Sequence, residues 1–162
     1  GSSNPVDPDG APLNLTPNIN MLAPNCLRQA GARVAKFPFI TGSDRYTSND
    51  VPIFRYADVL LMKAEILMRS TGDMGSALTL VNEVRARANA TPLSEITFES
   101  LLAERGRELY AEGFRRSDMI RFGVYLEPRW EKPDVSPSYV TLWPIPQSQI
   151  EANPNLDQND GY

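Results

Sequence analysis

The sequence predicts an all-α protein of paired helices with long irregular flanking segments. The first indication is proline: of the 14 prolines, seven lie before residue 53, one lies between residues 53 and 127, and six follow. Because proline blocks helix interiors, the middle of the chain is expected to be helical and both flanks irregular. The second is the helical spacing of apolar residues between positions 54 and 88. The third is segment 96–123, which has the pattern of a helix, a glycine stop and a short second helix.

We expect two regions. Residues 1–52 form an irregular segment rich in turn-forming residues, in which residues 1–3 are typical of an expression scar, and residues 53–162 form a helical domain with an irregular C-terminal tail. Residues 29–40 are expected to be loop with room for one short strand, since Arg33 to Phe37 partly alternate between polar and apolar.

The first predicted helix spans residues 54–70. Its apolar stripe contains Phe54, Ala57, Leu60, Leu61, Ala64, Leu67 and Met68, and Tyr56, Val59, Met62 and Ile66 widen it. A helix that is apolar over most of its circumference is expected to be buried between neighbours. Glu65 and Arg69 are spaced to pair across one turn.

The second predicted helix spans roughly residues 74–88. Gly72 and Asp73 end the first helix and cap the second, because aspartate is a good N-cap. Ala77, Val81 and Val84 supply its apolar face, and Glu83 and Arg87 are spaced to pair. The short connection predicts that the two helices are antiparallel neighbours.

Segment 96–123 follows the only proline of the helical block. Thr97 is expected to be the N-cap of a third helix, with Ile96 and Leu101 forming a hydrophobic staple around it. Gly113 is expected to end this helix in the left-handed conformation.

Charged residues share the apolar face of this third helix. Arg105 and Glu112 point the same way as Leu102 and Leu109 at 100° per residue. A charge on such a face must be paired, because an unpaired buried ion is very costly. We therefore predict a semi-buried structural ion-pair network made of Arg105, Glu108, Glu112, Arg115, Asp118 and Arg121.

The same glutamates admit a catalytic interpretation. Glu104, Glu108 and Glu112 follow each other at four-residue spacing, and Glu108 with Glu112 could form the carboxylate pair of a retaining glycosidase. The interleaved arginines argue for a structural role, since they lower carboxylate pKa values and keep the groups ionised. We therefore assign no catalytic residue.

Composition excludes several other classes. The formal net charge of −4 gives no support for nucleic-acid binding, and without histidine there is no Ser-His-Asp triad and no His-ligated metal site. The single cysteine, Cys26, is interpreted as a semi-buried structural thiol rather than a reactive one. No calcium-loop spacing occurs, no run approaches the roughly 20 apolar residues of a membrane-spanning helix, and no signal peptide opens the chain. We expect no metal and no cofactor.

A proline-rich, charged loop follows the helical block and carries three aromatic residues, Tyr125, Trp130 and Tyr139. Such rings can stack on sugars or anchor a partner, or they can pack back onto the helical core. Residues 140–146 are expected to be extended, and residues 147–151 to form one helical turn.

Four blocks of the sequence resemble, in their order and spacing, the SusD/RagB family of outer-membrane nutrient-binding lipoproteins. They are RYADVLLMKAE at 55–65, VNEVRARA at 81–88, the block from ERGREL at 104 to DMIRFG at 123, and the ending that joins WPIP at 143 to NPNLDQN at 153. Asp160 stands where the family often has proline. The resemblance covers roughly residues 36–162 and identifies the chain as the C-terminal portion of such a protein.

The resemblance implies an α-helical fold with tetratricopeptide-like helix pairs. Gly72, Asp73 and Ala77 match the turn and second-helix alanine of such a repeat, whereas Glu65 replaces its usual small residue. It also implies a cell-surface protein of the outer membrane, held by a lipid anchor that is not in this chain. Such a protein captures oligosaccharides or polysaccharides for a TonB-dependent transporter and performs no catalysis. Tyr125, Trp130 and Tyr139 are the local candidates for glycan contact. The alternative is a helical-repeat scaffold that binds a peptide or protein.

Overall fold

The computed structural model describes residues 50–162 and, before them, residues 6, 9, 10, 12, 13, 15, 31, 36, 37 and 42. The chain divides into two compact units, residues 1–51 and 52–162, against an expected boundary between 52 and 53. Cys26, expected to be a structural thiol, and most of the segment 29–40, with its expected loop and short strand, lie outside the described residues.

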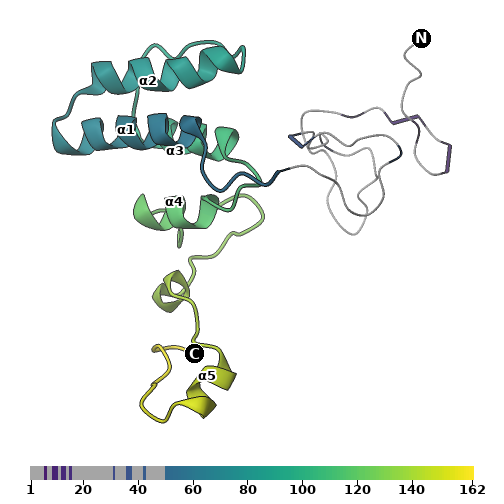
Figure 1. Cartoon of the computed structure of the whole chain (residues 1–162), viewed down its shortest axis with the longest axis vertical. Helices are drawn as coiled ribbons and strands as arrows, with labels where there is room; N and C mark the ends of the chain where they lie inside the picture. Colours follow the sequence, from purple (N-terminus) through teal and green to yellow (C-terminus); the bar gives the residue numbers. More distant parts are fainter. Residues whose placement is uncertain are drawn as a thin grey trace. The chain divides into compact units, whose positions relative to one another are not determined.

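The described part of the second unit is helical and contains no strand. Its elements are α1 (Tyr56–Ser70), α2 (Met74–Arg87), α3 (Phe98–Glu108), α4 (Arg115–Arg121), the 3-10 helix η1 (Ser138–Thr141) and α5 (Gln147–Ala152) (Figure 1). The all-α prediction is therefore correct. No helix in this part of the chain is both long and apolar enough to cross a bilayer.

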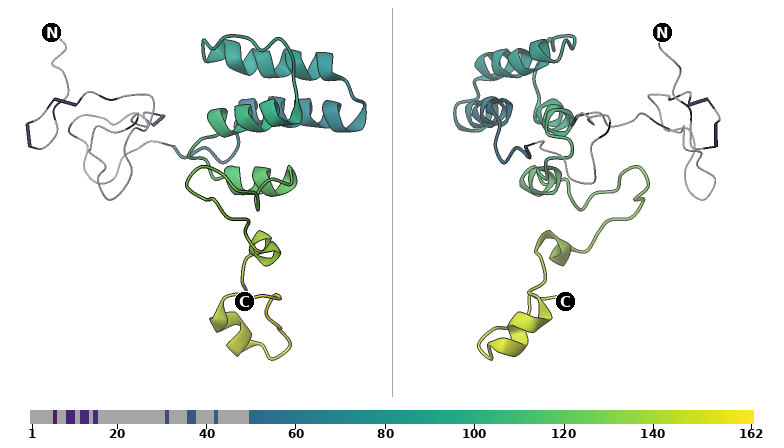
Figure 2. Two further views of the ribbon diagram at one scale, coloured as in Figure 1. Left: turned by 180° about the vertical axis from the view of Figure 1, so that it is seen from behind. Right: turned by 45° about the vertical axis from the view of Figure 1, so that its right-hand side comes forward.

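The first two helices form an antiparallel pair, side by side in each view (Figure 2). The turn between them uses Gly72 at a positive φ of 67°, and the Asp73 side chain accepts a hydrogen bond of 2.9 Å from the Ser76 N–H. Asp73 is thus the N-cap that the sequence predicts. A backbone twist that favours glycine, followed at once by a helix cap, reverses the chain and gives the tetratricopeptide-like hairpin.

The core lies between this pair and α3. Leu61, Ala64, Ala77, Val81 and Leu101 are each completely buried. They belong to one cluster that also contains Ala57, Leu60, Met68, Val84 and Ile96. The small alanines let the helix backbones approach closely, so the spacing of the pair is set by the side chains at the contact.

The opposite face of α1 is exposed, which corrects the expectation that this helix is buried between neighbours over most of its circumference. Tyr56 is 71% exposed, Ile66 62%, Val59 47% and Met62 39%. The reason is geometric: α2 and α3 make the most extensive contacts with α1, and both lie on its core side.

The third helix begins as predicted. The Thr97 hydroxyl accepts from the Ser100 N–H at 3.1 Å, and the Ser100 hydroxyl accepts from the Thr97 N–H at 2.8 Å, which is a reciprocal capping box. Ile96 and Leu101, the expected staple, both lie in the buried core.

The same helix ends four residues earlier than predicted, at Glu108 rather than Glu112. The Glu108 carbonyl would accept the N–H of Glu112 in a continued α-helix. It instead accepts a hydrogen bond of 2.8 Å from the Arg55 guanidinium, and the Glu112 N–H turns to the Leu109 carbonyl. Ala111 and Gly113, with φ of 62° and 86°, then lead the chain into α4.

The C-terminal tail is held by side chains. Gln158 bonds both the N–H and the carbonyl of Ile145 at 2.9 Å, and the Asn159 amide donates to the Trp143 carbonyl at 2.7 Å. The expected turn at 147–151 is present as α5. The expectation of extended chain from 140 onward is wrong for Val140 and Thr141, which lie in η1. Carbonyls near the end of η1 accept hydrogen bonds from the Arg116 guanidinium, which favours the 3-10 turn.

Candidate functional site

Six buried carboxylates are paired with arginines across α1 to α4 and the turn after α3. We call them, with their partners, the arginine–carboxylate network. Each of the six side chains is at most 7% exposed. They are Asp58, Glu65, Glu104, Glu108, Glu112 and Asp118. Buried ions at this density are tolerated only where each is matched by an opposite charge.

Arg105 is the central cation of this network and is 2% exposed. Its Nε donates to Asp118 at 2.8 Å, and its Nη1 lies 3.0 Å from the Asp58 carboxylate in an ion pair that lacks hydrogen-bond geometry. Arg105 therefore ties α3 to both α1 and α4.

A second group of ion pairs links α4 to α1. Arg121 bonds Asp118 at 3.0 Å and both Glu65 oxygens at 2.8–2.9 Å, and Arg69 bonds Glu65 at 2.8 Å. The Glu65–Arg69 pair is as predicted. Burial alone would raise the pKa of Glu65, but hydrogen bonds from Arg121 and Arg69 outweigh it and lower the pKa. The hydrogen bond to Glu65 in turn raises the pKa of Arg121.

Arg55, just before α1, binds both remaining glutamates of the turn region. It donates to the two Glu112 oxygens at 2.7–3.0 Å and to a Glu108 oxygen at 2.8 Å. The hydrogen bond to Glu112 raises the pKa of Arg55, against the opposing effect of its own burial. Arg87, expected to pair with Glu83, instead bonds both Glu108 oxygens at 2.7–2.9 Å.

Glu104 closes the network on the side of α2. It accepts from Arg85 at 2.5 Å and from Arg107 at 2.6 Å. Arg115, placed in the network by sequence reasoning, instead donates to the Leu102 carbonyl at 2.9 Å. No described carboxylate bonds Arg115, because its guanidinium lies along the backbone of α3 rather than toward the core.

Sequence reasoning placed Arg105, Glu108, Glu112, Asp118 and Arg121 in such a network, and the structure describes each of them in ion pairs. It left out Glu104 of α3, and it missed the members contributed by α1, by α2 and by the residue before α1. These are Arg55, just before α1, Asp58 and Glu65 of α1, and Arg85 and Arg87 of α2. The signal was available in α1, where Asp58 and Glu65 fall on the same helical face as Leu61 and Met68 and thus meet the criterion applied to Arg105.

The geometry of these carboxylates argues against the glycosidase interpretation. Glu104 and Glu108 line a cavity of about 510 Å³, but Glu104 is bonded to Arg85 and Arg107, which line the same cavity, and Glu108 is bonded to Arg87 from outside its lining. Glu108 and Glu112 bind one guanidinium of Arg55 instead of facing each other across a substrate site. A general acid must carry a proton near neutral pH, whereas arginine partners favour the ionised carboxylate. Among the described residues, no group of three or more His, Cys, Asp or Glu is arranged to hold a metal ion.

Stability should depend on pH through Glu65. Its folded-state pKa lies below the ordinary value of 4.5, so its contribution is fully present above that pH and is lost as the pH falls through the lower folded value. We expect the free energy of unfolding to decrease below pH 4.5, and to decrease less in Glu65→Gln. Urea unfolding at pH 7 and pH 3.5 measures both, and parallel profiles for the two proteins would contradict the assignment.

Two of the three candidate aromatics pack within the second unit. Tyr125 lies under the guanidinium of Arg116 at 5.3 Å, and Tyr139 makes an edge-to-face contact with Tyr162 at 5.0 Å. In the described part of the chain, no ring–ring contact joins any two of the three candidates.

Trp130 differs from the other two candidates. It is 65% exposed and sits at the tip of a tight turn closed by two 2.8 Å hydrogen bonds between Arg129 and Lys132. The Lys132 ammonium donates to three carbonyls of the same loop, at 2.6–3.2 Å. A braced loop thus presents a largely exposed indole, as a stacking platform requires.

Comparison with known proteins is consistent with this architecture. The profile of the SusD family matches residues 29–162. The chain is 39% identical to the starch-binding protein SusD of Bacteroides thetaiotaomicron over 72% of its length and 22% of that protein. It is 29% identical to the SusD-like protein P38 of Formosa agariphila, over 80% of this chain and 28% of that protein.

Solved structures also superpose on this chain. Surface glycan-binding protein A from Bacteroides uniformis superposes with a TM-score of 0.61 at 31% identity, over 68% of this chain and 28% of that one. A SusD superfamily protein from Bacteroides vulgatus gives 0.60 at 28% identity, over 68% and 27%. The chain therefore spans between a fifth and a third of the length of the relatives it matches.

Proposed function

The chain belongs to the SusD family, and on that premise we propose that it is part of a cell-surface protein that captures oligosaccharides or polysaccharides. The observation that carries the proposal in this chain is the open indole of Trp130 on its braced turn. An indole face stacks on the apolar face of a sugar ring, and loop hydrogen-bonding groups fix its orientation. Two relatives are named as binders of starch and of surface glycan, which favours a saccharide over a peptide ligand.

The cellular setting completes the proposal. The protein acts at the outer membrane, held there by a lipid anchor, and passes captured saccharide to a TonB-dependent transporter. Capture and release need no bond to be broken. A network whose carboxylates are all paired with arginines is compatible with such a role. The protein is accordingly a binding protein and not an enzyme.

Binding is tested by affinity electrophoresis and isothermal titration of the 162-residue chain against soluble starch and a panel of plant and host polysaccharides. We expect Trp130→Ala to weaken saccharide binding at least about tenfold, and Trp130→Phe to retain most of it because a stacking ring remains. Val135→Ala is the matched control, since Val135 is 69% exposed in the same loop. Binding that is equal in Trp130→Ala and the parent would contradict the assigned site.

A further inference from the structure

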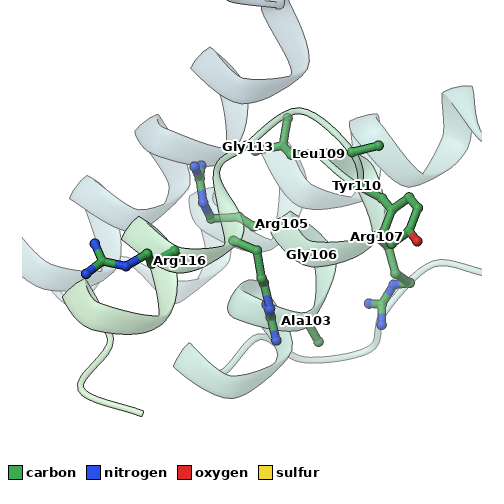
Figure 3. A pocket seen from close by; sticks show the side chains of 10 residues that line it. Ala103, Arg105, Gly106, Arg107, Leu109, Tyr110, Gly113 and Arg116 are labelled. Carbon is green, nitrogen blue, oxygen red and sulfur yellow. The ribbon is translucent and has the colours of Figure 1, made fainter. Parts of the chain in front are cut away.

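A cavity of about 610 Å³ lies beside the turn that joins α3 to α4 (Figure 3). Four of its lining residues are arginines and none is acidic. This is unusual in a chain whose formal net charge is −4. A concave site lined by one sign of charge attracts ligands of the opposite sign.

Two of these arginines have no carboxylate partner in the described part of the chain. Arg115 donates through Nη1 to the Leu102 carbonyl, and Arg116 donates through Nη2 to the carbonyls of Val140 and Thr141. Each guanidinium has five N–H donors in a planar fork, so donors remain for a ligand after these backbone contacts. Their positive charges are not neutralised locally, unlike those of Arg105 and Arg107, which pair with carboxylates.

The two guanidinium groups are held in place rather than free to move. Arg116 stacks on the Trp143 ring at 4.1 Å. Arg115 lies against Gly106 so closely that a Cβ there would come within 2.7 Å of its Nη1. Glycine in the interior of a helix is unfavourable, and here it leaves the space that the guanidinium occupies. Preorganised donors of this kind lower the cost of binding an anion.

The rest of the lining is apolar. Leu109 and the exposed ring of Tyr110 lie on the wall, and Figure 3 shows Tyr110 beside Arg107 on one side and Arg116 on the other, with Gly106 between them. A ligand that suits this cavity therefore presents an apolar ring face together with a fixed negative charge. A sugar ring that carries a carboxylate or a sulfate has both features, and bidentate contact with arginine suits either group.

We propose that this cavity binds an acidic saccharide residue, with Arg115 and Arg116 holding its carboxylate or sulfate and Tyr110 facing its ring. The inference rests on the glycan-binding function proposed above and narrows its ligand class to anionic glycans.

The test compares three saccharide probes of similar length by isothermal titration of the 162-residue chain: a maltohexaose, an oligogalacturonate and a sulfated carrageenan oligosaccharide. We expect at least one acidic probe to bind at least about tenfold more tightly than the neutral probe, and its binding to weaken as salt is raised. The carboxylated and sulfated probes distinguish the two sources of charge.

Two variants locate the binding. Arg115→Gln should weaken acidic-probe binding at least about tenfold, since hydrogen bonds to charged groups are the strong ones. Gly106→Ala should weaken it without lowering the melting temperature, because alanine favours the helix while its methyl group displaces the Arg115 guanidinium. Gly75→Ala is the control: the nearest atom to its Cβ is 3.7 Å away, so acidic-probe binding should not change.

The outcomes separate the two proposals. If neutral and acidic probes bind equally, or if the Arg115 and Gly106 variants bind the acidic probe like the parent, the anionic site is overturned and the glycan-binding function stands. If no saccharide of either kind binds to the folded chain, both fail for this chain. An oligoglutamate of matched charge that binds as tightly as the oligogalacturonate would overturn the saccharide assignment.

Discussion

Arg105→Met is expected to lower the free energy of unfolding by about 3–5 kcal/mol, the cost of leaving a buried ion without its partner. Arg105 is the cation of Asp58, and each side chain is 2% exposed. Methionine fills a similar volume but leaves the Asp58 carboxylate buried beside an apolar group. Asp118 would keep Arg121 but lose its 2.8 Å contact with Arg105. Urea unfolding monitored by circular dichroism measures the loss.

Arg107→Met on the same helix is the matched control for Arg105. The Arg107 side chain is 57% exposed, and its partner Glu104 keeps Arg85, so we expect a loss of at most about 1 kcal/mol. Asp58→Asn added to Arg105→Met should recover part of the stability, because it removes the unpaired charge. Equal, small losses for the two arginine variants would show that the network does not hold these helices together.

Glu112→Gln is expected to lower the free energy of unfolding by about 1.5–3 kcal/mol, the range for a hydrogen bond to a charged group. The amide can accept fewer of the three Arg55 hydrogen bonds that Glu112 now accepts and carries no charge to balance it. The effect is smaller than for Arg105 because Arg55 keeps Glu108 and is itself 26% exposed. The melting temperature and the urea midpoint report it.

The Glu112 effect also separates a structural from a catalytic role. Glu83→Gln, at an exposed position of α2, should change stability by no more than about 0.5 kcal/mol. A double variant with Arg55→Met should cost less than the sum of the two single changes, because the two residues act through one contact. Hydrolysis of a glycoside by the parent that disappears in a fully folded Glu112→Gln protein would refute the structural assignment.

Local chemistry determined most of the helical block. The caps at Asp73 and Thr97, the positive φ at Gly72 and Gly113, and the apolar spacing of α1 and α2 all depend on residues within a few positions of each other. Interactions at that range are encoded in the sequence and hardly depend on the rest of the fold. The presence of charged residues in the core was predictable in the same way, from charges that share a face with leucines.

The partners of those charges could not be predicted from the sequence. Arg55 lies 57 positions from Glu112, and Arg121 lies 56 positions from Glu65. In the sequence, several arginines are equally good candidates for each counter-ion. Only the packing of α1 and α2 onto α3 selects among them. Arg115 and Arg87 were paired wrongly for this reason: both reach other acceptors once the helices are in place.

The sequence by itself determined that the region after residue 52 is helical, where α2 and α3 begin, and that the core contains ions, because capping and periodicity are short-range effects. The tertiary structure alone decided that α3 ends at Glu108, since a guanidinium more than 50 residues away takes the carbonyl that the next helical turn needs. It also decided which face of α1 stays exposed and which arginines keep free donors around a cavity. Those outcomes depend on which groups become neighbours in space, and the spacing of residues along one helix does not determine that.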